Sequence, residues 1–268
     1  MMLDATRHYD QPLTADRLFA WHASLFPTGR SGMRTIRAGT WRDDHTGPMQ
    51  VVSGRIGRER VHYEGPAAGR LAQEMQAFLE WFEDAGAGHD PVLKAGLAHL
   101  WCATMHPFDD GNGRMARAIA DLALARSERS AQRFYSMSSQ IRQERAAYYD
   151  ILERTQRGTL DVTPWMEWFL ACPSRAIDGA QTTLAAVLAK PRFWQTLGTA
   201  PVNERQRFML NRLLEGFEGH LTTSKWATTA TCSSDTALRD ILELVERGIL
   251  ERNPGRGRST SYSLAGIQ

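Results

Sequence analysis

Residues 106–117 read HPFDDGNGRMAR and place a histidine, two acids, a glycine-rich turn and two arginines within twelve positions. Apolar stretches flank this segment, from Val92 to Met105 before it and from Met115 to Leu124 after it. Both stretches have helical spacing. The sequence therefore predicts two core helices joined by residues 106–117, which we call the motif.

The glycine-rich turn of the motif, Gly111-Asn112-Gly113, opens the second of these helices. The first N–H groups of a helix have no partner within it and lie at the positive end of its dipole, so they attract anions. Arg114 and Arg117 are three positions apart, and both guanidinium groups can reach the same anion. The turn therefore predicts a phosphate site.

Two further motif residues suggest chemistry at that phosphate. A carboxylate beside phosphates is unfavourable unless a cation lies between them, which makes Asp110 the candidate magnesium ligand. His106 has a free pKa near neutrality and is the candidate general base. Alone, such a histidine is more often structural, and an Asp-Gly-Asn-Gly run is usually a tight turn. Their joint occurrence favours the catalytic interpretation.

Helical periodicity also dominates the rest of residues 1–200. It predicts one helix after a Thr14 cap, another around residues 71–82, one opened by Thr163-Pro164 and one over residues 176–188. The exception is a predicted hairpin between residues 49 and 63, the only convincing strand pair in this part of the chain. We expect a mainly α catalytic domain over residues 1–200, ended by the break at residues 198–201.

Residues 201–268 are expected to form a separate small domain. Apolar faces around residues 208–217, 224–229 and 237–245 predict three helices, and residues 249–252 and 261–264 predict a two-stranded wing. This order resembles a winged helix-turn-helix domain. The helix after Ser233 is rich in acids, so DNA binding is possible but weakly supported, with Arg252, Arg256 and Arg258 as the candidate phosphate contacts. Contact with a target protein or a subunit is slightly favoured.

The composition fits a soluble globular chain. Of 268 residues, 42% are hydrophobic and 23% are charged, and the formal net charge is +2. No run of about 18 apolar residues suggests a membrane span. Cys102, Cys172 and Cys232 are odd in number and lack paired metal spacing, which argues against a disulfide framework or a zinc site. We therefore expect no membrane partner and a cytoplasmic location.

The motif resembles the Fic signature His-x-Phe-x-Asp/Glu-Gly-Asn-Gly-Arg-x-x-Arg at every specified position. The resemblance covers roughly residues 14–190 and implies a Fic-type helical bundle with a small β-hairpin flap. The family's target-docking flap is similar to the hairpin segment Arg60, Val61, His62 and Tyr63. Its base-binding segment is similar to the region of Tyr148, Tyr149 and Gln156. By resemblance the chain is a protein adenylyltransferase.

The same resemblance implies the individual roles. His106 would deprotonate a Ser, Thr or Tyr hydroxyl of a target protein, which attacks the α-phosphorus of ATP and releases pyrophosphate. Asp110 would hold Mg²⁺, and residues 111–113, with the Asn112 side chain, would stabilise the developing charge. Arg114 and Arg117 would hold the β- and γ-phosphates, and Phe108 would point into the core. A homodimer is plausible from the family.

One feature found in many Fic proteins does not match this sequence. Their inhibitory helix has the pattern Ser/Thr-x-x-x-Glu-Gly/Asn, whereas Glu64, Glu215 and Glu218, the glutamates followed by Gly or Asn, have no Ser or Thr four positions earlier. We therefore expect a chain that is active as it stands. It would be either a piece of a longer autoinhibited protein or a protein controlled by a partner.

Two other functions stay open from the sequence. The same site could remove AMP from a modified protein or transfer another phosphate-containing group, although removal normally needs the glutamate that is missing here. Alternatively, the chain could be a DNA-binding regulator that senses a nucleotide. The intact His106 speaks against a sensor, because a sensor would need the phosphate turn but no base.

Overall fold

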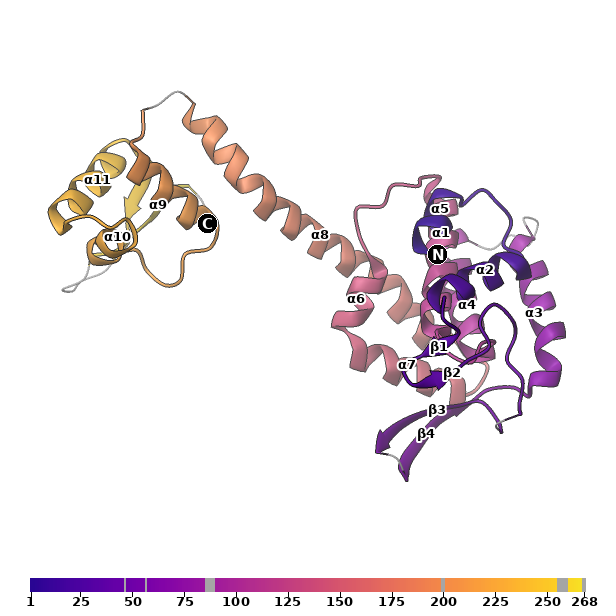
Figure 1. Ribbon diagram of the computed structural model, residues 1–268. Helices are drawn as coiled ribbons and strands as arrows, with labels where there is room; N and C mark the ends of the chain where they lie inside the picture. The colour runs from indigo at the N-terminus through magenta and orange to yellow at the C-terminus, as the bar shows by residue number, and fades with distance from the viewer. Residues whose placement is uncertain (46, 56, 85–89, 199–200, 255–259, 267–268) are drawn as a thin grey trace. The chain divides into compact units, whose positions relative to one another are not determined.

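The computed structural model describes residues 1–268 apart from 46, 56, 85–89, 199–200, 255–259 and 267–268. The chain divides into two compact units, Met1–Ala180 and Gln181–Gln268 (Figure 1). The division falls inside the long helix α8 (Thr163–Leu197), whereas the sequence pattern placed the boundary where α8 ends. Each unit is described by itself below.

Helix α8 differs from the sequence-based expectation of two helices, because it runs unbroken for 35 residues. Pro173 lies inside this helix, where a proline removes one intrahelical hydrogen bond. However, Phe169, Cys172 and Ala176 lie on both sides of this proline and are all buried, and Phe169 and Cys172 belong to the first core. Packing on that face therefore offsets the lost hydrogen bond.

The first unit is mainly helical, as predicted. Its motif joins α4 (Pro91–Met105) to α5 (Asn112–Glu128), and Thr14 caps its predicted helix by accepting the Arg17 N–H at 3.2 Å. Short helices at the N-terminus and between α5 and α8 were not predicted. The remaining helices are α1 (Met2–Arg7), α2 (Ala15–Leu25), α3 (Ala68–Glu83), α6 (Met137–Gln143) and α7 (Arg145–Arg157).

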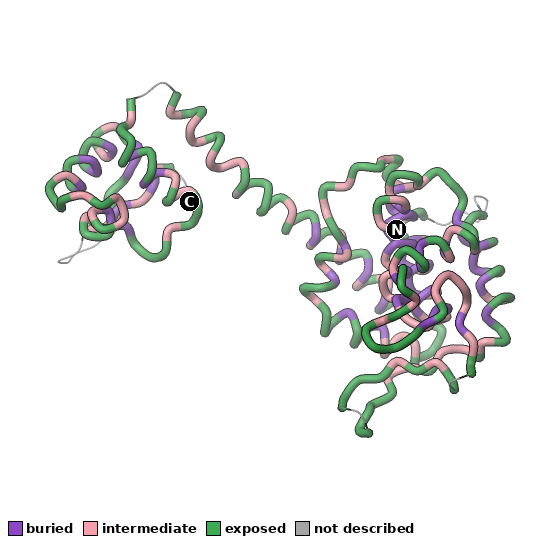
Figure 2. Tube along the Cα trace, viewed as in Figure 1, coloured by how far each residue is buried: buried purple, intermediate pink, exposed green. Residues whose placement is uncertain are grey.

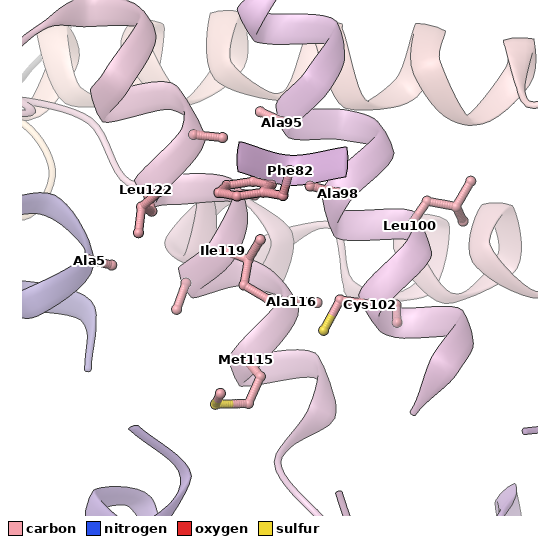
Figure 3. Packing of buried hydrophobic residues seen from close by; sticks show 14 of the residues in the cluster. Ala5, Phe82, Ala95, Ala98, Leu100, Cys102, Met115, Ala116, Ile119 and Leu122 are labelled. Carbon is pink, nitrogen blue, oxygen red and sulfur yellow. The ribbon is translucent and has the colours of Figure 1, made fainter. Parts of the chain in front are cut away.

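Helices α4 and α5 form the centre of the first core (Figure 3). Small side chains such as Ala95, Ala98 and Ala116 line their inner faces and are fully buried, which lets the two backbones approach closely. Gly96 serves the same packing, because a Cβ there would lie 2.9 Å from the Phe169 ring. The core thus fixes the two helix ends between which the motif is held.

The predicted hairpin is confirmed as β3 (Gln50–Arg55) and β4 (Arg58–Glu64), an antiparallel pair with a register shift between Val51 and Val52. It is exposed along most of its length (Figure 2). A second, unpredicted pair joins β1 (Arg30–Ser31) to β2 (Arg34–Thr35). This pair is only two residues long on each side, too short for a periodic pattern to reveal it.

The second unit contains the three predicted helices and the predicted strand pair. Its elements are α9 (Glu204–Leu214), α10 (Thr223–Thr229), α11 (Ser234–Glu246), β5 (Leu250–Arg252) and β6 (Tyr262–Leu264). They enclose a core of their own around the fully buried Trp226. Assignment as a winged helix stays a prediction, and Arg256 and Arg258 lie outside the described residues.

Helix α11 provides a direct test of this second core, because Ile241 is fully buried and its neighbour Leu242 is 52% exposed. We expect Ile241→Ala to destabilise the unit by about 2–5 kcal/mol, whereas Leu242→Ala should change little. Hydrogen exchange of the α10 and α11 amides in the full chain would measure this. Equal protection in the two variants would contradict the assigned packing.

Within the described residues, no helix combines the length and the apolar character that a membrane crossing needs.

Candidate active site

A cavity of about 730 Å³ in the first unit brings the motif, the hairpin and α7 together. Most of the site residues expected from the sequence line it, although they come from positions as far apart as 62 and 156. Arg60 and Val61 of the expected flap segment do not line it. Those that do are His62, Tyr63, His106, Asp110, Gly111, Asn112, Gly113, Arg114, Arg117, Tyr148, Tyr149 and Gln156.

His106 lies immediately after α4, in a left-handed backbone conformation with φ +47° and ψ +57°. Its Nδ1 is 2.6 Å from the carbonyl oxygen of Ala103. A carbonyl can only accept, so Nδ1 carries the proton in the neutral ring. The other nitrogen, Nε2, is therefore left with its lone pair and can accept a proton.

The surroundings of His106 keep its ring neutral. Burial lowers the pKa of His106 below the 6.5 of a free imidazole, and the charge of Arg42 lowers it further. The hydrogen bond to Ala103 and the charge of Asp110 act in the opposite direction but do not cancel the decrease. The His106 ring is therefore unprotonated at neutral pH.

Arg42, which the sequence analysis did not identify, anchors the main chain of this histidine. It is 4% exposed, and its Nε donates to the His106 carbonyl at 2.7 Å. Its other nitrogens bind the Asp44 carboxylate at 2.9 Å and the Pro66 carbonyl. Arg42 is buried and binds three segments of the chain. It therefore fixes the end of α4 and the position of the His106 ring.

The glycine turn forms the N-terminus of α5. Gly111 has φ +79°, and a Cβ there would lie 3.0 Å from the Phe26 ring, so conformation and space both favour glycine. The Gly111 carbonyl accepts the N–H groups of Arg114 and Met115. Among the described residues, the N–H groups of Asn112 and Gly113 have no protein acceptor. They are the free donors on which the predicted anion site depends.

The side chain of Asn112 has a different task from the expected one. Its Oδ1 accepts the Phe108 N–H at 2.9 Å and its Nδ2 donates to the Phe108 carbonyl at 2.7 Å, with the residue 3% exposed. The amide group thus braces the loop, which corrects the expectation that it stabilises charge on a ligand. What Asn112 offers to an anion is its main-chain N–H.

Phe108 points into the core, as expected, and rests on a histidine that was not expected to act in the site. The rings of His22 and Phe108 are stacked with centroids 4.1 Å apart. His22 Nδ1 accepts the Gly39 N–H at 3.0 Å, so its Nε2 donates to the Asp110 carbonyl at 3.1 Å. Burial lowers the pKa of His22, which keeps this buried ring neutral.

Asp110 presents a carboxylate that is 45% exposed at the cavity. Burial alone would raise its pKa, but hydrogen bonds from Ser31 and from the Gly111 N–H, with the charge of Arg114, lower the pKa below 3.8. The side chain is therefore ionised at neutral pH. Each carboxylate oxygen keeps a lone pair beyond these hydrogen bonds, so the group can still bind a cation.

The two motif arginines lie on the same side of α5. Arg114 packs over the Phe26 ring at 4.7 Å and reaches Asp110 only at 3.9 Å. Arg117 makes no ion pair within the described part of the chain, and one of its terminal nitrogens lies 3.5 Å from the position of a Cβ on Gly113. Both guanidinium groups therefore remain available to an anion at the turn.

The two tyrosines of α7 differ in exposure. Tyr148 is 2% exposed and its hydroxyl lies 3.0 Å from Nε2 of His99, a buried ring whose pKa is lowered to about 3 by burial. Tyr149 is 48% exposed and meets Tyr148 edge-on, with ring centroids 5.1 Å apart. Tyr149 is therefore the ring that a ligand can reach, with the Arg145 guanidinium over it at 5.6 Å and Tyr148 packed beside it.

Gln156, also on α7, uses its side-chain amino group for hydrogen bonds to α4. Its Nε2 donates to the Ala103 carbonyl and to the Thr104 hydroxyl, both at 3.3 Å. The Ala103 carbonyl is also the acceptor for His106. Gln156 thus helps to hold the Ala103 carbonyl, which orients the His106 ring. The side-chain oxygen of Gln156 can still accept from a ligand.

The hairpin is held to α7 by a glutamate that the sequence analysis did not identify. Glu153 accepts from Nδ1 of His62 at 2.6 Å and from Arg60 at 2.9 Å, and Arg157 donates to the carbonyls of His62 and Val61. Arg60 and the Val61 carbonyl are used in these contacts, and neither residue lines the main cavity. They also hold β4 in place beside α7.

Strand β3 faces the cavity from the other side. Residues 49–53 line the cavity, and β3 pairs only with β4 among the described strands. Its outer edge therefore carries main-chain donors and acceptors that a further strand could pair with. The hydroxyl of Tyr63 on β4 donates to the Thr104 carbonyl at 2.9 Å and fixes the hairpin to the end of α4.

Comparison with known proteins identifies this region. Residues 12–124 match the Fic/DOC family. Two relatives named protein adenylyltransferase Fic, from Drosophila willistoni and Drosophila melanogaster, are 30% identical over 138 residues and 32% identical over 139 residues. Each match covers 50% of this chain and 26% of the relative, so the chain spans about a quarter of the length of these proteins.

Two solved structures share the fold. A Fic family protein from Desulfovibrio desulfuricans has a TM-score of 0.55 and 21% identity over 100% of this chain and 73% of its own. A Fic domain containing signaling protein from Bacteroides thetaiotaomicron has a TM-score of 0.52 and 20% identity over 67% of this chain and 66% of its own. At these identities the likeness concerns the fold.

Proposed function

Because its residues 12–124 make this chain a Fic/DOC family protein, we propose that it transfers AMP from ATP to a hydroxyl group of another protein. The observation that carries the proposal is the orientation of His106. Its Nδ1 is committed to the Ala103 carbonyl, and its ring lines the cavity that the helix N-terminus and two arginines also line. A base and an anion site therefore share one cavity.

The chain offers a place for each part of the nucleotide. The main-chain N–H groups of Asn112 and Gly113 would bind the phosphate that reacts, and Arg114 and Arg117 would bind the two that leave. The exposed ring of Tyr149 would stack on the adenine of ATP. These groups come from two segments, α5 and α7, that line the same 730 Å³ cavity.

Asp110 fits the role of a magnesium ligand. Its carboxylate is ionised and partly exposed at the cavity, beside the anion site. The described residues contain no cluster of three or more side chains that could hold a metal by themselves. Mg²⁺ suits such a place, because it takes one or two carboxylates and completes its shell with phosphate oxygens and water. When bound, it would neutralise charge on the leaving phosphates.

The reaction then needs one proton transfer and one displacement. Nε2 of His106 takes the hydroxyl proton as the target oxygen forms a bond to the α-phosphorus. The bond from that phosphorus to the oxygen bridging to the β-phosphate breaks, and the electron pair leaves with pyrophosphate. Donors at the turn stabilise the charge on the α-phosphoryl oxygens, and Arg114 and Arg117 stabilise the charge on the leaving group.

The target protein would approach along β3. Its free edge could pair with an extended segment through main-chain hydrogen bonds, which depend little on sequence. The contacts of Glu153 and Arg157 with β4 would keep that edge in place beside His106. The hydroxyl to be modified would thus be presented to Nε2.

A pH profile tests the role of His106. Because burial lowers its pKa, the ring loses its proton below pH 6.5, and the transfer rate should rise with pH to a plateau. The expected acid limb therefore has a midpoint below 6.5. Initial rates of adenylyl transfer between pH 4.5 and 8 would measure it. A midpoint above 7 would contradict the assigned environment.

The function itself is tested by mass spectrometry of a modified protein. The chain, ATP and Mg²⁺ are incubated with a cell lysate, and a labelled band is isolated and digested. We expect one Ser, Thr or Tyr to gain an adenylyl group with this chain and not with its His106→Ala variant. Gain of a single phosphoryl group with release of ADP would show a kinase instead.

A further inference from the structure

A second hollow of about 390 Å³ adjoins the main cavity in the first unit. The two share the side chains of Arg114, Arg117, Arg145, Tyr148 and Tyr149, so they border each other at these residues. Its remaining lining comes from the start of α1 and from α6. These residues are Met1, Met2, Ser138, Ile141 and Arg142.

The charge of this hollow is entirely positive. Four arginines line it, at positions 114, 117, 142 and 145, and its lining includes no carboxylate. Within the described residues, Arg117 and Arg142 have no ion-pair partner. Arg145 contacts only the Tyr149 ring, at 5.6 Å, and Arg114 reaches Asp110 at no less than 3.9 Å. Such a group of cations favours an anion of high charge.

We propose that this hollow binds inorganic pyrophosphate and receives it from the main cavity after transfer. The choice of this anion rests on the proposed function, which produces pyrophosphate beside Arg114 and Arg117. Pyrophosphate carries several negative charges on closely spaced oxygens, and arginine donates to such groups in pairs. Arg142 and Arg145 supply two further forks that the motif does not contain.

The four arginines are divided unequally between the two cavities. Arg114 and Arg117 are shared by both cavities, whereas Arg142 belongs to the second hollow alone and is exposed. Neither His106 nor Asp110 lines the second hollow. Pyrophosphate that moves toward Arg142 therefore leaves the base and the reactive phosphorus behind. This displacement lowers the chance of the reverse reaction.

Binding of pyrophosphate tests the proposal without any need for activity. Isothermal titration calorimetry with sodium pyrophosphate compares the full chain with its Arg142→Gln/Arg145→Gln variant. Each charge-assisted contact contributes on the order of a tenfold change in Kd, so the double variant should bind about a hundredfold more weakly. The matched control is Arg129→Gln, which removes an arginine just beyond the other end of α5.

Three results decide the matter. Weaker binding in the double variant, with the control unchanged, supports the site. Equal binding in all three chains, or no binding to the unsubstituted chain, overturns it. Arg142→Lys/Arg145→Lys keeps the charge and should lose less affinity, which separates loss of contacts from loss of folding. Pyrophosphate binding by a chain that transfers no AMP would leave the site standing and remove the proposed function.

Discussion

Replacing His106 by alanine is expected to reduce AMP transfer by about 10²–10⁴-fold, the usual contribution of a positioned general base. The Kd for ATP should not change, because the groups assigned to the phosphates are the turn and the arginines, and the imidazole takes only the target's proton. Rates of transfer from labelled ATP and the Kd from calorimetry would separate the two effects.

The matched control for this loss is His45→Ala. His45 belongs to the same unit and its side chain is 88% exposed, so its removal should leave transfer unchanged. Loss of ATP binding in the His106 variant would assign the ring to the nucleotide and not to the proton. Transfer at the unsubstituted rate would remove His106 from the mechanism.

Replacing Asp110 by asparagine is expected to have the second large effect. The amide is nearly the same size, and its oxygen can accept from the Gly111 N–H while its NH₂ donates to the Ser31 hydroxyl, but it lacks the negative charge that would hold Mg²⁺. We expect the rate to fall by about 10²–10³-fold at low magnesium, comparable to loss of a main electrostatic contact in the transition state. A magnesium titration of the rate should show partial recovery at high concentration.

Asp109→Asn is the control for this change. Its carboxylate accepts the Arg37 N–H at 2.8 Å, and an amide oxygen can accept the same hydrogen bond. This variant should therefore keep most of the activity and the unsubstituted magnesium dependence. An equal loss in both variants, or a loss in Asp110→Asn that magnesium does not relieve, would contradict the assigned role.

The parts of the site that residue spacing alone predicts lie within one short segment, whereas His62, Tyr63, Tyr148, Tyr149 and Gln156 were expected only from the family resemblance. The spacing of His106, Asp110, Arg114 and Arg117 along a loop and a helix start fixes their approximate arrangement, because helix geometry is regular. The two flanking core helices are likewise clear from their apolar faces. The predicted hairpin, residues 49–63, also lies close to the observed strand pair.

The parts that could not be predicted are contacts between distant segments. His22 binds the Asp110 carbonyl across 88 positions, and Arg42 binds the His106 carbonyl across 64. The periodicity of α2 predicts that His22 is buried, but not what its ring nitrogens bind. Glu153 was missed for the same reason, since its partners lie on the hairpin. The Asn112 side chain was assigned to the ligand because the sequence does not show that it turns back to Phe108.

The central claim is that the imidazole of His106 and the anion site at the start of α5 act together on the α-phosphorus of ATP. The most direct measurement compares ATP labelled at the α-phosphate with ATP labelled at the γ-phosphate, each incubated with the full chain, Mg²⁺ and a lysate. The account predicts that the protein labelling lost in His106→Ala comes from α-labelled ATP alone. Labelling from γ-labelled ATP that is lost in His106→Ala, or identical labelling by the two chains, would contradict it.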